Sequence, residues 1–173
     1  GADEDAGATG DLDILTDMTL LGAGPALTVI QGNNDRVFDI LGTETTVSLA
    51  DMTLTGGDVT ANEGDGGALR IAGFSTVTLT NMVLTGNRAA RGGAIANTSI
   101  FTMDHSVVSH NTATLGGALF NAGTGTLDRS TLYNNSAMQG GGVYNGSTSN
   151  LTVLSSTVSS NTASLQGGGF FLQ

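Results

Sequence analysis

The sequence contains no cysteine, no tryptophan and no lysine, and a single proline. The absence of cysteine excludes disulfides and thiolate metal sites, but it does not fix the compartment. Five arginines face 15 acidic residues, which gives a net charge of −10. This balance repels phosphate backbones and anionic lipid, so we expect no nucleic-acid or membrane-surface partner. No run of 18 apolar residues occurs, so we expect no membrane span in this segment.

Glycine and small polar residues dominate what is present. The 173 residues include 27 glycines and many threonines, serines and asparagines. This composition favours many short strands joined by tight turns over helices. The chain starts at Gly1 without a charged-then-apolar leader, so we expect any export signal to be removed already or to lie outside this sequence.

One phrase of nine or ten residues is written four times in the second half. Its copies are Asn87–Ile95, Asn111–Leu119, Asn135–Val143 and Asn161–Phe170, and each contains Ala at its third position and a Gly-Gly pair. Their first residues, at positions 87, 111, 135 and 161, lie 24, 24 and 26 residues apart. A period of this size indicates one supersecondary unit stacked on copies of itself. The fourth copy has one extra residue before its glycines, which predicts a bulged corner.

A second phrase alternates apolar and polar residues. Its copies are a weak one at Leu15–Gly22, then Leu49–Gly56, Leu79–Gly86, Met103–His110, Leu127–Asn134 and Val153–Ser160. Read at period 2, Leu79, Met82 and Leu84 point inward, and their equivalents in the other copies do the same. No amphipathic window long enough for a helix alternates with these strands.

We therefore expect an all-β fold, a single-stranded parallel β-helix of about six to seven rungs with three short strands per rung. The whole chain, 1–173, forms one domain in this interpretation. Its expected parts are an irregular acidic entry segment (1–13), irregular first rungs (14–56), a corner loop (57–66) and regular repeats of 24–26 residues (67–173).

These phrases resemble a known family. The pattern Asn-Thr-Ala-x-x-Gly-Gly, with Leu-x-x-Ser before it, is similar to right-handed parallel β-helix repeats of bacterial exported and surface proteins, including polymorphic outer-membrane proteins of autotransporter type. The opening Asp5–Ile14, together with Asp35–Phe38, resembles a module that usually follows a Cys-Ser-Leu-Arg-Glu-Ala motif. The resemblance implies a right-handed coil and an extracellular or cell-surface setting, but no single activity. That motif and a carboxy-terminal anchor are missing from the sequence, so we expect a processed or excised piece of a longer protein.

The repeated asparagines and glycines are interpreted as corners. Two asparagine columns are expected, one of Asn87, Asn111, Asn135 and Asn161 and one of Asn97, Asn121 and Asn145. Stacked amides can hydrogen-bond along a column and satisfy corner carbonyls, and ligand binding is the alternative. The turn glycines are Gly92, Gly93, Gly116, Gly117, Gly140, Gly141, Gly167 and Gly168. They let the backbone pass without side-chain bulk.

Two aspartates form the best catalytic candidate. Asp104 and Asp128 hold the same repeat position, so they are expected one rung, about 4.8 Å, apart. This is close to the separation of about 5–5.5 Å in retaining glycosidases. His105 and Arg129 follow them in the next column. The alternative interpretation is two solvated aspartates beside a histidine and an arginine, on rungs too uniform to form a cleft.

Two further sites depend on residue type alone. The acidic start offers hard oxygen ligands for one structural calcium ion, and no other cofactor is expected; its ligand candidates are Asp3, Glu4, Asp5, Asp11 and Asp13. The outward pairs of one strand column suggest an ice-binding surface, although threonine also suits any exposed strand. These pairs are Thr53/Thr55, Val83/Thr85, Val107/Ser109, Thr131/Tyr133 and Thr157/Ser159.

The end of the sequence gives the leading functional hypothesis. The last repeat stops at an apolar stretch that contains Phe170, Phe171 and Leu172, without a capping helix. An open solenoid edge pairs with something, and a heterologous end-to-end contact propagates into a fibre. We expect a non-enzymatic extracellular stalk, adhesin segment or filament subunit that self-associates end to end, with a glycan or a cell surface as a further partner. The alternative is a polysaccharide hydrolase or lyase that uses Asp104 and Asp128.

Overall fold

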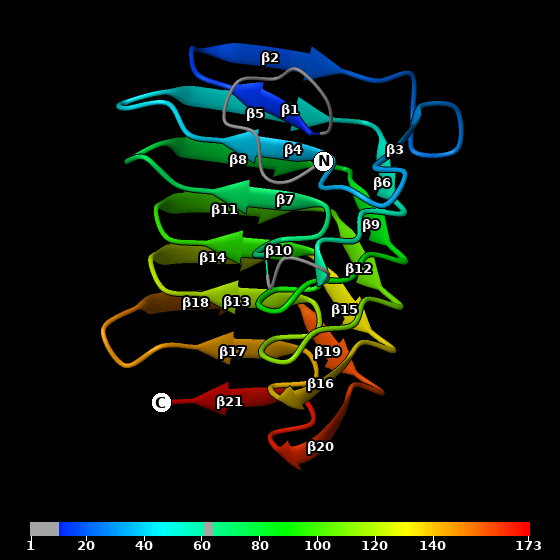
Figure 1. Ribbon diagram of the computed structural model, residues 1–173, viewed down its shortest axis with the longest axis vertical. Helices are drawn as coiled ribbons and strands as arrows, with labels where there is room; N and C mark the ends of the chain where they lie inside the picture. Colours follow the sequence, from blue (N-terminus) through cyan, green and yellow to red (C-terminus); the bar gives the residue numbers. More distant parts are fainter. Residues whose placement is uncertain (1–10, 61–63) are drawn as a thin grey trace.

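The fold is a coil of short parallel strands stacked as rungs along one axis (Figure 1). The computed structural model describes residues 11–60 and 64–173. These residues form 21 strands, and every strand pairing between them is parallel. Glycine, asparagine and serine break the chain every few residues, so no strand exceeds five residues and each rung turns several corners.

Three sheets run the length of the coil, and a two-stranded sheet lies on a further side of the last rungs. Sheet A contains β1 (Leu12–Ile14), β4 (Phe38–Ile40), β7 (Leu69–Ile71), β10 (Ile95–Asn97), β13 (Leu119–Asn121), β17 (Val143–Asn145) and β21 (Phe170–Leu172). Sheet B contains β2 (Met18–Leu21), β5 (Thr46–Ala50), β8 (Thr76–Thr80), β11 (Ile100–Asp104), β14 (Thr124–Asp128) and β18 (Asn150–Leu154). Sheet C contains β3 (Val29–Gln31), β6 (Thr53–Thr55), β9 (Val83–Thr85), β12 (Val107–Ser109), β15 (Thr131–Tyr133) and β19 (Thr157–Ser159). Sheet D contains β16 (Ser136–Gln139) and β20 (Thr162–Gln166).

Each rung has a fourth side besides the three expected strands. In the middle rungs this side is held only by isolated bridges, such as Arg88 with Thr112 and Arg91 with Leu115. It becomes a regular ladder in sheet D, where the register shifts between Ala137 and Gln139. The extra residue in the fourth copy of the repeat is therefore accommodated as the predicted bulge.

The core is a set of apolar columns inside the coil. Alternate strand residues point inward, so each inward side chain packs on its equivalent one rung away. One column holds Leu49, Leu79, Met103 and Leu127, each at most 1% exposed. The expected inward pair Met82 and Leu84 is buried as well. Parallel stacking of identical positions thus turns a sequence repeat into a continuous apolar core.

The corners use left-handed backbone at fixed positions. One column, between sheets B and C, has positive φ at Asp51, Asn81, His105, Arg129 and Ser155. A second, after sheet C, has it at Gly56, Gly86, His110, Asn134 and Ser160. A third falls on the first residue of the Gly-Gly pair, at Gly66, Gly92, Gly116, Gly140 and Gly167. Only the third column is glycine throughout, because there an added Cβ would meet backbone atoms: at Gly116 it would lie 2.2 Å from the carbonyl oxygen of Leu119.

The beginning of the chain differs from expectation in two ways. Leu12 and Asp13, expected in an irregular entry segment, belong to β1; residues 1–10 lie outside the described part. The alignment of Leu15 with Leu49 is wrong, because Leu20 pairs with Leu49 and Leu15 is 59% exposed. The short apolar run around Leu20 fits either register by hydrophobicity alone.

The first rungs join the same three sheets as the later ones. What is irregular is the connections, such as the segment from Gly22 to Thr28 between β2 and β3. The expected corner loop lies between β6 and β7, and bridges from Asp58 to Arg88 and from Asp65 to Arg91 hold its two ends. Residues 61–63 of this loop lie outside the described part.

Candidate functional site

The four residues of the catalytic candidate meet at the corner between sheets B and C. Asp104 and Asp128 end β11 and β14 and pair in register. His105 and Arg129 follow them, with φ of 46° and 44°. Left-handed backbone of this kind favours glycine or asparagine. His105 and Arg129 instead project long side chains from this corner.

Arg129 bridges the two carboxylates. Its Nη2 lies 2.8 Å from Asp104 Oδ1 and its Nη1 lies 2.8 Å from Asp128 Oδ2. His105 Nδ1 lies 2.9 Å from Asp104 Oδ2 and 3.3 Å from Arg129 Nε. If His105 Nδ1 donates to the carboxylate of Asp104, it cannot also accept from the guanidinium of Arg129. The contact with Asp104 is the shorter of the two and is the charge-assisted hydrogen bond.

These contacts keep Asp104 ionised. The hydrogen bond from His105, and after it the bond and charge of Arg129, lower the pKa of Asp104 below its usual value. A carboxylate with a lowered pKa suits a nucleophile or a charge stabiliser, whereas a general acid needs a raised pKa. The cluster can thus hold or stabilise positive charge, and the lowered pKa of Asp104 does not suit that carboxyl as a general acid.

A carboxyl titration followed by NMR tests this electrostatic assignment. We expect Asp104 to titrate below 3.8, the value for an unperturbed aspartate, and Asp39, whose carboxyl is buried on β4, to titrate above it. In Arg129→Gln the Asp104 midpoint should rise toward that value, while Asp39, on sheet A, stays unchanged. Equal midpoints for Asp104 in the two proteins would show that the guanidinium does not act on it.

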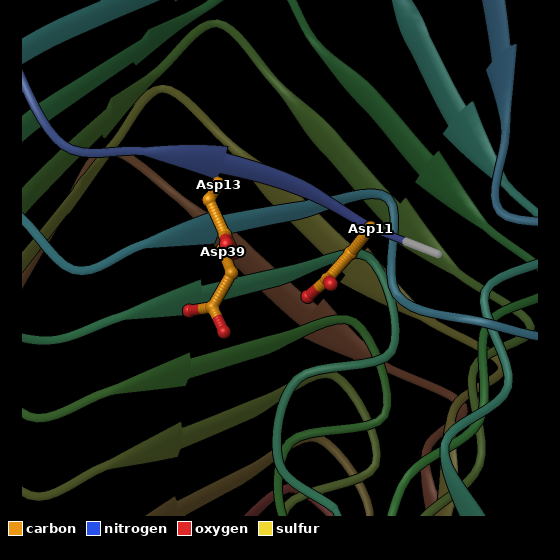
Figure 2. A group of neighbouring side chains, drawn as sticks. All are labelled: Asp11, Asp13 and Asp39. Atoms are coloured by element: carbon orange, nitrogen blue, oxygen red, sulfur yellow. The ribbon is translucent and has the colours of Figure 1, made fainter. Parts of the chain in front are cut away.

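A second charged cluster lies at the amino-terminal end of sheet A. Figure 2 shows the carboxylates of Asp11, Asp13 and Asp39 gathered beside β1 and β4, and their nearest oxygens lie within 4.8 Å of one another. Asp11 and Asp13 were candidate calcium ligands; the other candidates, Asp3, Glu4 and Asp5, lie outside the described residues. The sequence reasoning missed Asp39, because its place next to Asp13 depends on the register of β1 with β4.

Two arginines contact the carboxylates of Asp11 and Asp39 in this cluster. Arg36 Nη1 lies 2.5 Å from Asp11 Oδ2 and 2.6 Å from Asp39 Oδ2, and its Nε donates to the carbonyl oxygen of Asp65. Arg70, one rung on, donates from Nε to Asp39 Oδ1 at 2.8 Å. Arg36 is 4% exposed and Asp39 is 1% exposed. Burial raises the pKa of Asp11 and of Asp39 in spite of these partners. The carboxylates of Asp11 and Asp39 are therefore engaged by guanidinium groups, which supply positive charge of the kind that a calcium ion would bring.

The asparagine columns are hydrogen-bonded ladders. Asn87, Asn111 and Asn135 are at most 1% exposed, and the backbone N–H of each donates to the side-chain oxygen of the next at 2.9–3.0 Å. Each Nδ2 donates to the same oxygen and to a carbonyl of the preceding rung, as Asn111 does to Leu84 at 3.0 Å. In the second column, Asn97 donates to Asn121 at 2.7 Å and Asn121 to Asn145 at 2.8 Å. The side-chain amides of these asparagines therefore make their hydrogen bonds with other groups of the coil.

Truncation of one ladder residue should be costly. We expect Asn111→Ala to lower the free energy of unfolding by about 2 kcal/mol, because the buried N–H of Asn87 loses its acceptor. Asn161→Ala, on the partly exposed last rung, is the matched control and should cost less. Urea denaturation followed by circular dichroism measures both. A loss for Asn111→Ala no greater than for Asn161→Ala would contradict the structural role of the ladder.

Two other ladders were not predicted from the sequence. Ser106, Ser130 and Ser156 form one at the corner after His105 and its equivalents: each hydroxyl accepts from a backbone N–H of the previous rung. The serine of the Leu-x-x-Ser phrase was the available signal. On the outer face of sheet A, Phe120, Tyr144 and Phe171 stack with ring centroids 5.3 and 5.0 Å apart. These rings sit in register on β13, β17 and β21, and Arg91 lies over Phe120.

Comparison with known proteins agrees with this geometry. Residues 41–173 match the family model described as right handed beta helix region. The chain therefore belongs to the right-handed β-helix family, and its three long parallel sheets are the walls of such a coil. No curated protein and no solved structure matches the chain significantly. Among the described residues, no helix is long and apolar enough to cross a membrane.

Proposed function

We propose that the chain is a non-enzymatic structural β-helix of the extracellular space or cell surface, which stacks end to end as a stalk or filament segment. The observation that carries the proposal is the set of apolar side chains on the last described rung. Its apolar side chains reach solvent: Val153 is 39% exposed, Phe170 38% and Leu172 70%. In the rungs before it, the equivalents of Val153 and Phe170 are fully buried, because another rung covers them.

Apolar side chains lie on the first and last strands of the coil in the same register. In sheet A the column from Leu12 ends at Phe170, and the column from Ile14, which is 2% exposed, runs through the second asparagine ladder to Leu172. In sheet B the column from Leu20 ends at Val153, and in sheet C the column from Ile30 ends at Val158. A head-to-tail contact would bury the exposed members of these columns against each other and pair the strand edges that have no partner among the described residues.

Outside the core the two ends match less well. The outer column of sheet A begins with Asp13 and ends with Phe171, so a stacked copy would place a carboxylate over an aromatic ring. We therefore expect reversible association that depends on concentration. The uniform ladders along the side walls support a role as a rod, because they engage the repeated polar residues within the coil.

Electron microscopy and analytical ultracentrifugation test this proposal. The purified chain should form rods whose length grows with concentration, and Phe170→Lys should shorten them, because it places a charge in the contact. Met138→Lys is the matched control, since Met138 is 46% exposed on a side wall. Single coils at every concentration would refute end-to-end stacking.

The competing hypothesis is a carbohydrate-active enzyme. It is supported by the register that sets Asp104 beside Asp128 and by Arg129 between them. If it holds, the chain cleaves or eliminates a polysaccharide, and Asp104→Asn and Asp128→Asn each abolish that activity. Absence of activity across a panel of polysaccharides, or activity that survives both substitutions, would eliminate this assignment.

A further inference from the structure

The outer face of sheet B is the most regular surface of the coil. Four of its neighbouring strand pairs, from β5 to β18, match five residues to five without a bulge. Residues 1, 3 and 5 of each strand point outward, and the register stacks them in three columns parallel to the coil axis. Figure 1 shows the stacked strands of this sheet, among them β5, β8, β11 and β14. Every outward residue therefore has an equivalent at the same height on the next strand.

The middle column consists of hydroxyl side chains, and the first column contains three threonines among its five residues. The middle column is Thr19, Ser48, Thr78, Thr102, Thr126 and Thr152. The first column is Thr46, Thr76, Ile100, Thr124 and Asn150. Neither column contains a charged or aromatic residue, although the chain carries a net charge of −10. Charges lie at two borders of this face: Asp17 precedes β2 and accepts from the backbone N–H of Thr46, and Asp104 and Asp128 lie in the third column beside Arg129.

The columns define a two-dimensional array. Neighbouring strands lie about 4.8 Å apart, and alternate residues along a strand lie about 6.6 Å apart. Threonine is β-branched, so its hydroxyl and methyl groups are held in few orientations. Each hydroxyl has one donor and two acceptor positions, and well-ordered water can bridge such groups to a ligand. A rigid, uncharged array of this kind fits a solid with a repeating surface better than a single small molecule.

We propose that the outer face of sheet B binds ice. Ice presents rows of water molecules with repeats of the same order as the strand spacing, and each water can replace one that a threonine hydroxyl already orders. Crystalline polysaccharide is the nearest other repeating solid, but proteins hold sugar rings largely through aromatic faces, and the first and middle columns contain none. This inference is independent of end-to-end stacking, because the face lies on a side wall.

The location differs from the one that the sequence suggested. The expected ice surface was the outer face of sheet C, and its pairs do stack there in register. Its columns, however, mix Val83, Val107 and Ser109 with Tyr133, whose ring rises from the surface and contacts His110. Sheet C also has strands of only three residues, so it offers two outward columns where sheet B offers three.

Ice affinity of the purified chain tests the proposal. We expect thermal hysteresis, inhibition of ice recrystallisation, and enrichment in a slowly grown ice hemisphere. Thr102→Tyr, at the centre of sheet B, should lower the hysteresis activity about tenfold, the effect of losing one strong contact. Thr157→Tyr, exposed on sheet C, is the matched control and should leave it unchanged. Tyrosine is favoured in strands, and circular dichroism checks that both variants are folded.

The outcomes separate this site from its alternatives. Exclusion of the wild-type chain from growing ice would overturn the proposal. So would activity that Thr157→Tyr removes and Thr102→Tyr preserves, because it would move the site to sheet C. Retention on crystalline cellulose or chitin, without ice affinity, would assign the face to a polysaccharide instead. Sedimentation of the same samples reports end-to-end stacking separately, and Thr102→Tyr should not alter it.

Discussion

Gly117→Ala is expected to destabilise the coil by more than about 3 kcal/mol, or to prevent folding, because an added methyl group would fill the space between two rungs. Its Cβ would lie 2.3 Å from the carbonyl oxygen of Gly141 and 2.6 Å from that of Ser136. Both atoms are backbone of the next rung, so neither can move aside without breaking the parallel ladder. Gly117 lacks a positive φ, and the effect is therefore one of contact rather than of backbone conformation.

Gly56→Ala separates these two causes. Gly56 has φ of +68°, and a Cβ built there meets nothing within 4 Å. Only the left-handed backbone opposes this substitution, at a cost of about 1 kcal/mol. Thermal and urea unfolding should therefore rank Gly117→Ala as far more damaging than Gly56→Ala. Equal losses would mean that the rungs are not packed as closely as described.

Arg36→Met should lower the free energy of unfolding by about 3 kcal/mol, which is the low end of the range for breaking a buried ion pair. The substitution leaves the carboxylates of Asp11 and Asp39 buried without this partner. The loss is not greater, because Arg70 still contacts Asp39. Arg88→Met is the matched control: the Arg88 side chain is 61% exposed and its Nε lies 3.7 Å from Asp58. Exposed pairs of this kind contribute little, so we expect it to be near neutral.

The pH dependence of Arg36→Met gives a second readout. Burial raises the pKa of Asp11 and Asp39, and Arg36 opposes that rise, so its removal raises both further. A carboxyl whose pKa is raised by folding favours the folded state at low pH and loses that contribution as pH rises through its folded pKa. The deficit of the variant should therefore be larger at pH 7 than at pH 4, and Asp11→Asn should recover part of it. A deficit independent of pH would indicate lost packing rather than uncompensated charge.

The repeat period carries most of the information about the fold. Once Asn87 and Asn111 are read as equivalent positions, stacking follows, since a parallel coil places residues one period apart on neighbouring rungs. The same reading places Asp104 beside Asp128, and Arg129 beside both. The repeat period gives the wrong register where the repeat is irregular. It aligns Leu15 with Leu49, whereas Leu20 is the residue that pairs with Leu49. The connection before β2 does not resemble a later corner, so only the apolar pattern was left to choose the register, and it fits both.

The charged cluster at the first rungs could not be predicted for a related reason. Arg36, Asp39 and Arg70 have no equivalents in the later copies, and their contact depends on β1, β4 and β7 lying in one sheet. The outer column of sheet A changes from these charges through Ala96 to the stacked rings of Phe120 and Tyr144. A column whose side chains change from charged to aromatic shows no sequence repeat, so it cannot be predicted until the register of the strands is known.

Site-directed crosslinking tests end-to-end stacking most directly. The chain has no cysteine, so each introduced thiol is unique. In the stacked register Phe170 of one copy lies one rung, about 4.8 Å, from Leu12 of the next, which is within the Cα separation of about 4.4–6.8 Å that a disulfide needs. A mixture of Phe170→Cys and Leu12→Cys proteins under mild oxidation should yield a disulfide between positions 170 and 12, while Met138→Cys should not replace either partner. Recovery of monomers alone, or of disulfides between two copies of the same variant, would contradict head-to-tail stacking.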